Sequence, residues 1–191
     1  MCTCFSHALV AGVAGKMIFP GPMPKHFLPI AMICSAAPDL DYGLHHYGVE
    51  YGDLWGHRGM THSIPFAFVA AALVVTLCFR RYAGRDVRRW LSLHAFFTVI
   101  IASHGVIDGF TNGGLGIAYF SPFDTTRYFM PYTPIEVSDL GLRNVFTARF
   151  VQVMLSEFLW VWLPTLVILA PLCALRMWWR RRTTVDAQPT T

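Results

Sequence analysis

Charged residues are scarce in this chain. Only 14% of its 191 residues are Asp, Glu, Lys or Arg, whereas 54% are hydrophobic. A soluble domain carries about 25% charged residues, so the composition favours lipid as the solvent for much of the surface. The partners expected from this composition are membrane lipids, and no nucleic-acid partner is expected.

Cysteines are few, and their spacing does not match a zinc-binding pattern. Cys34, Cys78 and Cys173 lie within apolar runs and are expected to be small buried hydrophobes. Cys2 and Cys4 have two further alternatives, pairing with a partner or carrying a lipid. A purely structural zinc site is therefore less favoured than a catalytic site built from other donors.

The sequence contains several long stretches of apolar residues that carry little or no charge. Residues 64–79, 90–110 and 158–175 approach the roughly 20 residues that a membrane-spanning helix needs. Two shorter runs, residues 9–19 and 27–37, predict either two thin spans or a re-entrant hairpin. The predicted fold class is all-α, a polytopic membrane helical bundle. Residues 1–182 are expected to form one integral-membrane domain, followed by a disordered cytoplasmic tail at 183–191.

The distribution of arginine predicts the orientation of the bundle. Two arginine groups flank the strong apolar runs, and the positive-inside rule places both in the cytoplasm. They comprise Arg80, Arg81, Arg85, Arg88 and Arg89, and then Arg176, Arg180, Arg181 and Arg182. Eight carboxylates fall on the opposite side, among them Asp39, Asp41 and Asp108. The prediction is a multi-pass protein of the inner membrane whose polar face is extracytoplasmic.

Histidine and carboxylate side chains occur where the apolar runs begin or end. His104 and Asp108 are four residues apart, so they share one helix face and suit either a metal site or a structural polar pair. His57 and His62 lie before the run that starts near Ile64, where metal ligation and plain solvation are the alternatives. Ser63 is the predicted N-cap of that helix, and Pro65 suits its first turn.

Two aspartates follow the second apolar run. Asp39 and Asp41 alternate across Leu40, which would point both carboxylates the same way if the stretch is extended. Capping or turn formation is the alternative role for each. His7 opens the first apolar run and would lie on the same side of the membrane as the other donors. Glu157, within the last span, is either a functional acid or a hydrogen-bond partner of Arg149 or Thr147.

Taken together, the donors predict one metal site at the outer face. They are His7, Asp39, Asp41, His57, His62, His104 and Asp108. Mixed imidazole and carboxylate donors suit Zn²⁺ first, with Mn²⁺ or Fe as alternatives, and seven of them suffice for one to three ions. The agreement of five segment ends on one side of the membrane favours convergence over coincidence.

Three stretches resemble the YdjM-type family of membrane-bound metal-dependent hydrolases. They are APDLDYG, HRGMTHSIPFAF and HGVIDGFTNGGLGIAYFSPFDTTRYFMP, within a resemblance that runs from His7 to about Pro131. The resemblance carries the family's polar residues onto the seven donors and onto Arg58, Thr61, Ser63 and Thr111. The H-x-x-x-D element is also similar to one in zinc-dependent phospholipase C and P1-type nucleases, which implies phosphoester chemistry.

The resulting hypothesis is metal-assisted hydrolysis of a phospholipid or another lipid-linked phosphoester. Asp39, Asp41 and Arg58 are the expected catalytic residues, with one aspartate acting as metal bridge or base. Substrate binding is assigned to four side chains: Arg58, Thr61, Thr111 and Arg127. The alternatives are an ion- or proton-coupled transporter using the same cluster, and a non-catalytic membrane scaffold. The sequence leaves the oligomeric state open.

Overall fold

The computed structural model describes residues 2–19, 21–137 and 147–168 together with Pro171, Ala174, Leu175 and Trp178, and the regular elements within them are helices. Within those residues the only β pairing is two isolated bridges, Thr111 with Ile135 and Ile117 with Tyr128. The prediction of an all-α fold is confirmed. Several predictions fall on positions outside the described residues, including Asp139, Arg143, Cys173, the second arginine group and the tail at 183–191.

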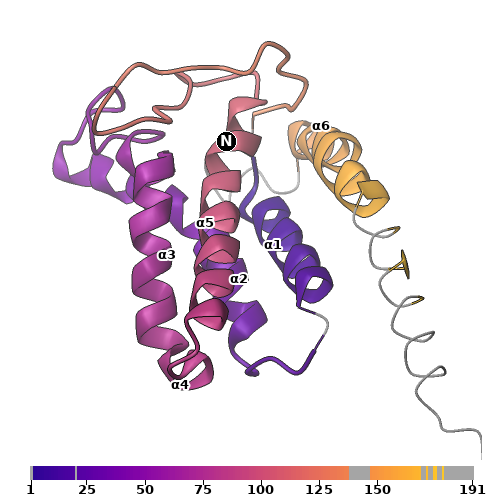
Figure 1. Ribbon diagram of the computed structural model, residues 1–191. Helices are drawn as coiled ribbons and strands as arrows, with labels where there is room; N and C mark the ends of the chain where they lie inside the picture. Colours follow the sequence, from indigo (N-terminus) through magenta and orange to yellow (C-terminus); the bar gives the residue numbers. More distant parts are fainter. Residues whose placement is uncertain are drawn as a thin grey trace, which may run out of the picture.

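Four apolar helices form the body of the molecule (Figure 1). α1 (Cys4–Ile18) packs against α2 (Phe27–Ala36), and α3 (Ile64–Cys78) packs against α5 (Val87–Gly109). α2 also packs against α5, which joins the two pairs. The short α4 (Arg80–Ala83) turns the chain between α3 and α5. The two early runs therefore form a pair of packed helices joined to the rest of the bundle through α2.

Local sequence fixes where the long helices begin. The Ser63 side chain accepts a hydrogen bond from Phe66 N, and Pro65 lies in the first turn of α3. The predictions for Ser63 and Pro65 are confirmed. Asp86 caps α5 by accepting hydrogen bonds from the backbone nitrogens of Arg88 and Arg89.

Aromatic rings fill the bundle end that is nearest to α4. Phe27 contacts Phe96 and Phe97 at centroid distances of 5.3 and 6.0 Å. Phe79 in turn lies 5.3 Å from Phe97, and Phe19 lies 5.4 Å from Phe96. Phe27, Phe79 and Phe97 are completely or almost completely buried. We call these five phenylalanines the phenyl cluster.

Two helices have the length and apolar composition of a membrane span, a test that the core helix of a soluble protein can also pass. They are α5 and the helix that covers Ala148–Ile168. The latter starts as α6 (Ala148–Glu157), continues as the π-helical η4 (Phe158–Trp162) and is described to Ile168. The sequence placed its start at Phe158, which is ten residues too late. Thr147 explains the difference, because its side chain caps the helix by accepting a hydrogen bond from Phe150 N.

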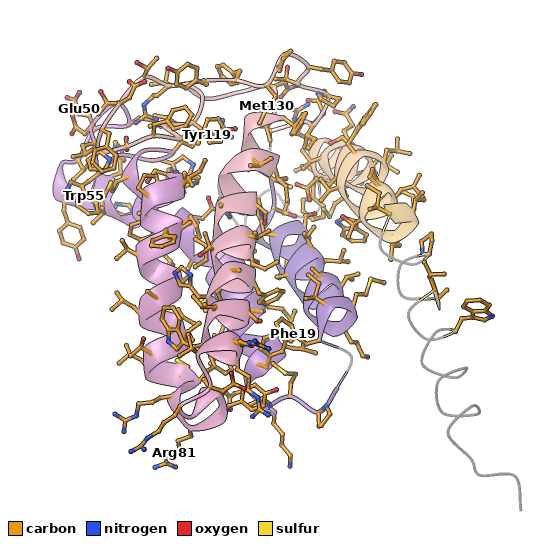
Figure 2. The ribbon with its side chains drawn as sticks, viewed as in Figure 1. Phe19, Glu50, Trp55, Arg81, Tyr119 and Met130 are labelled. Carbon is orange, nitrogen blue, oxygen red and sulfur yellow. The ribbon has the colours of Figure 1, made fainter. Side chains whose placement is uncertain are left out.

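Irregular chain caps the bundle at the end opposite to α4 (Figure 1). One part contains the 3-10 helices η1 (Ala37–Tyr47) and η2 (Met60–His62) with the loop between them, and the other is residues 110–137. Figure 2 shows Glu50, Trp55, Tyr119 and Met130 at this end and Arg81 at the other. The polar cap and the arginine-rich turn therefore lie at opposite ends of the helices, as the sequence predicted.

The cysteines depart from the expected pattern. Cys78, the last residue of α3, is exposed on the surface of the chain, whereas Cys34 is half-buried. The expectation that both are buried is wrong for Cys78. Cys2 is completely buried, and Cys4 is exposed.

Candidate metal centre

The bundle end beneath the cap contains imidazole rings in mutual contact. His7 of α1 stacks on His104 of α5 at a centroid distance of 3.8 Å. His62 of η2 lies edge-on to His104 at 4.7 Å, and His57 lies edge-on to His62 at 5.3 Å. All four rings are at most 5% exposed. We call these four histidines the imidazole cluster.

His104 is held in one tautomer by the backbone of α2. Its Nδ1 lies 2.7 Å from the carbonyl oxygen of Ser35, which can only accept, so Nδ1 carries the proton. Nε2 then presents a lone pair to Asp39 Oδ1 at 3.1 Å. Two facing acceptors at that distance repel unless a proton or a cation lies between them. A metal-ligating histidine is oriented in the same way, by a carbonyl on its other nitrogen.

His62 lies between two carboxylates. Its Nδ1 is 3.1 Å from Asp41 Oδ2, and its Nε2 is 3.6 Å from Asp39 Oδ1. Burial lowers the pKa of His62, but the hydrogen bonds and negative charges of the aspartates outweigh burial and raise it to about 9. Without a bound cation, His62 is therefore an imidazolium at neutral pH.

The two aspartates reach the cluster from a 3-10 helix. The condition that residues 38–41 are extended is not met, because Pro38 lies in the first turn of η1 and both aspartates lie within that helix. Asp41 receives a hydrogen bond from Thr61 Oγ1 at 2.5 Å, and its Oδ1 lies 2.7 Å from His57 Nδ1. Burial raises the pKa of Asp41, but His57, His62 and Thr61 outweigh it and lower it to about 2. Asp41 is consequently ionised over the whole physiological range.

Asp108 connects the imidazole cluster to the N-terminal segment of the chain. Its Oδ1 accepts a hydrogen bond from the backbone nitrogen of Cys2 at 2.7 Å and lies 3.5 Å from His7 Nε2. Its Oδ2 is 3.4 Å from Arg58 Nη2. Asp108 is completely buried. All seven predicted donors are thus linked by contacts at one end of the bundle.

Two sets of these side chains have the spacing of a metal site. In each set the ligand atoms lie within 4.8 Å of one another. The first set is Asp39, His62, His104 and Asp108, and the second is Asp41, His57 and His62. His62 belongs to both. His7 belongs to neither, although it stacks on a member of the first.

Several buried donor atoms of the seven residues, in the two sets and in the neighbouring His7, have no hydrogen-bond partner. They are both ring nitrogens of His7, Asp39 Oδ2, His62 Nε2 and Asp108 Oδ2. A buried polar atom without a partner costs about 1–3 kcal/mol, so this many in one place need an explanation. The carboxylate oxygens offer lone pairs to Zn²⁺, Mn²⁺ or Fe, neutral His7 offers one, and His62 Nε2 would offer one once its proton has left. The residues present therefore fit a divalent cation.

Both arginines that the sequence offered as substrate clamps are occupied by protein groups. Arg58 is fully buried, and besides its ion pair with Asp108 it donates to Thr111 Oγ1 at 2.8 Å and to Gly113 O at 2.5 Å. Arg127 donates to the carbonyl oxygens of His57 at 2.9 Å, of Tyr51 at 2.9 Å and of Asp53 at 3.1 Å. In this arrangement Arg58 and Arg127 order the cap around the imidazole cluster.

Glu157 links α6 to the N-terminal segment. Its carboxylate accepts hydrogen bonds from Thr3 N at 2.6 Å, Thr3 Oγ1 at 2.5 Å and Ser6 Oγ at 2.5 Å. The expected partner Arg149 pairs with Glu136 instead, at 2.8 Å. Sequence reasoning missed Thr3 and Ser6 because more than 150 residues separate them from Glu157 and no local pattern joins them.

One glycine allows α5 to approach η2. A Cβ atom placed on Gly105 would lie 2.6 Å from the carbonyl oxygen of His62. That oxygen belongs to the residue shared by both donor sets, and Gly105 directly follows His104.

The fold and the site together define a class: an all-helical membrane protein with a buried histidine and aspartate cluster of the metal-binding type. The chain belongs to the YdjM inner membrane protein family, whose model matches residues 1–182. It is 36% identical to the inner membrane protein YbcI of Escherichia coli strain K12 over 182 residues, which cover 95% of this chain and 100% of that protein. The family prediction is confirmed. No solved structure matches the chain.

Proposed function

We propose that this protein is a membrane-bound, metal-dependent hydrolase of a phospholipid or another lipid-linked phosphoester. The proposal rests on one observation: His62, Asp39 and Asp108 each have a buried ligand atom without a hydrogen-bond partner. A divalent cation bound there would lower the pKa of a water molecule to about 7 and polarise the phosphoester.

The chain's own residues divide the remaining work. Asp39 and Asp41 face the two ring nitrogens of His62 and stabilise its protonated form, and with His62 they would help to hold a cation. Asp41, hydrogen-bonded by Thr61 and lining a cavity, stays ionised and would help to hold the cation and orient its water. Arg58 holds Asp108 and Thr111 in place, and its charge lies beside the first donor set.

The site is proposed to face the extracytoplasmic side of the inner membrane. The arginine-rich turn at α4 lies at the bundle end opposite to the donors (Figure 2). By the positive-inside rule that turn is cytoplasmic, which directs the cap outward. Phosphate head groups of the outer leaflet then lie at the level of the cap.

Elemental analysis of the purified protein tests the proposal. His104→Ala removes a donor of the first set, and His94→Ala is the matched control. His94 also lies buried in α5, but it hydrogen-bonds Phe68 O and stacks on Trp90, away from the donors. We expect metal in the wild type and in His94→Ala, and its loss in His104→Ala.

Activity is then measured on phosphatidylcholine vesicles doped with a labelled anionic phospholipid. Release of the labelled phosphoryl product should require metal, stop on chelation and be absent in His104→Ala. A wild type without metal after chelator-free purification would overturn the proposal. So would product release that persists in His104→Ala.

A further inference from the structure

A cavity of about 230 Å³ opens beside the second donor set. Asp41 and His57 form one wall, and the other walls come from η1 and from the loop that follows it. The remaining lining residues are Tyr42, His45, Val49, Tyr51 and Gly56. The cavity therefore places Tyr42, His45 and Val49, to which no function has been assigned above, beside the two donor residues Asp41 and His57.

The aromatic walls hold the donor side of this cavity in place. The ring of Tyr51 lies edge-on to His57 at 5.3 Å, and the ring of Tyr42 does so at 5.9 Å. Arg127 holds the loop between η1 and η2 in place. Its guanidinium donates hydrogen bonds to the carbonyl oxygens of Tyr51 and His57 and lies 5.6 Å from the centre of the Tyr51 ring. This wall is ordered by the structure itself, before any ligand arrives.

His45 adds a further polar side chain to the lining of this cavity. Its Nδ1 lies 3.4 Å from the carbonyl oxygen of Val49, which can only accept, so Nδ1 carries the proton. Nε2 then remains for a ligand, and it donates to a phosphoryl oxygen in the imidazolium form, which carries a proton on both ring nitrogens. The His45 side chain is exposed and belongs to neither donor set.

The size of the cavity limits what can enter. Pockets for drug-sized ligands span about 300–1,000 Å³, so 230 Å³ fits a phosphoryl group with its glycerol but excludes two acyl chains. The segment that forms the cavity also exposes large apolar side chains: Leu40 is 78%, Tyr47 87% and Trp55 50% exposed. Aromatic side chains of this kind are enriched at the head-group level of a bilayer.

A larger cavity of about 430 Å³ lies among α1, α5 and the helix after α6, lined by residues such as Val10, Ile107 and Trp160. None of the seven donors lines it. It offers no contact to the reacting group. The smaller cavity is the one in which a ligand would touch Asp41 and His57.

From these observations we infer that the cavity between His45 and the Asp41–His57 wall is the head-group site for a glycerophosphoryl lipid. His45 contacts the phosphoryl group, and the acyl chains stay outside against Leu40 and Trp55. This inference rests on the proposed function and adds to it the part of the substrate that is recognised and the residue that recognises it.

Binding of short-chain probes to metal-loaded, full-length protein in phosphatidylcholine nanodiscs tests the inference. The probes are glycerol 3-phosphate and dihexanoyl phosphatidic acid, titrated by calorimetry. His45→Asn removes the proposed phosphoryl contact, and His46→Asn changes the neighbouring exposed histidine, which does not line the cavity. We expect His45→Asn to weaken both probes about tenfold, as for one hydrogen bond to a charged group, with the metal content unchanged.

Two outcomes would overturn the inference while leaving the proposed function intact. In one, His45→Asn and His46→Asn bind the probes equally well. In the other, glycerol 3-phosphate binds as tightly as the lipid probe, which would indicate a soluble phosphoester. Failure of the proposed function is recognised separately, because the wild type would then contain no metal.

Discussion

Both ends of the bundle are packed with aromatic rings, but they differ in whether the buried groups have hydrogen-bonding requirements. In the phenyl cluster every buried surface is apolar, and the rings satisfy one another through edge and tilted contacts. In the imidazole cluster, rings at similar spacing leave buried nitrogens and carboxylate oxygens without partners. The first end is complete as it stands. The second has buried donor atoms that a bound cation would satisfy.

The largest expected effect comes from the phenyl cluster. Phe97→Ala removes a fully buried ring and should lower the free energy of unfolding by about 3–5 kcal/mol. Denaturant unfolding in detergent micelles measures the loss. Metal content per folded chain should not change, because Phe97 contacts no donor. A parallel loss of metal would show that the two ends are not independent.

Metal removal should destabilise the imidazole end alone. A cation at a hundred times its dissociation constant stabilises the folded state by about 2.7 kcal/mol, so a chelator should lower the melting temperature of the wild type. His62→Ala removes the residue shared by both donor sets and should abolish that response. Phe97→Ala, although less stable, should keep it. An equal chelator effect in His62→Ala would contradict the assignment of the donors.

The link between α6 and the N-terminal segment should give a somewhat smaller effect. Glu157→Gln replaces one of the two accepting oxygens with an amide donor, which should cost about 1–3 kcal/mol of stability. Glu136→Gln is the control, because that carboxylate pairs with Arg149 near the surface, where an ion pair contributes about 0–1 kcal/mol. Equal unfolding free energies for the two variants would argue against a stabilising role for Glu157.

Metal affinity should also depend on pH. Because the pKa of His62 is raised to about 9, a cation must displace its proton below that pH. Metal affinity should therefore rise up to about pH 9, by about tenfold or 1.4 kcal/mol per pH unit for one displaced proton. Titration of metal binding between pH 6 and 9 measures the slope. A flat profile would contradict the displacement of a His62 proton.

The metal-free protein should show the opposite trend. His62 has its pKa raised above the unfolded value of about 6.5, so its stabilising contribution is complete below that pH and is lost as pH rises through about 9. Asp41, with its pKa lowered to about 2, loses its contribution only under strongly acidic conditions. Unfolding of chelated protein across this range provides the check.

The sequence predicted much of this arrangement because hydrophobic runs and their polar ends are local signals. The helices at α3 and α5, the Ser63 cap and the convergence of the seven donors follow from such ends. The 3-10 conformation of η1 could not be predicted from the sequence, because a short P-D-L-D pattern is compatible with several backbone conformations. The partners of Arg127 were equally hidden. The Arg127 guanidinium donates hydrogen bonds to backbone carbonyl oxygens of the cap. The positions of charged residues in a sequence do not show where such carbonyl groups will lie close together.

Gly105 has a consequence for the centre that its own chemistry would not suggest. The residue ligates nothing, yet the absence of one carbon atom there lets the main chain at His62 come within reach of His104. Gly105→Ala would act as a wedge and drive apart two rings whose own side chains are untouched. The spacing between the shared histidine and its neighbour is therefore encoded in a position that carries no functional group at all.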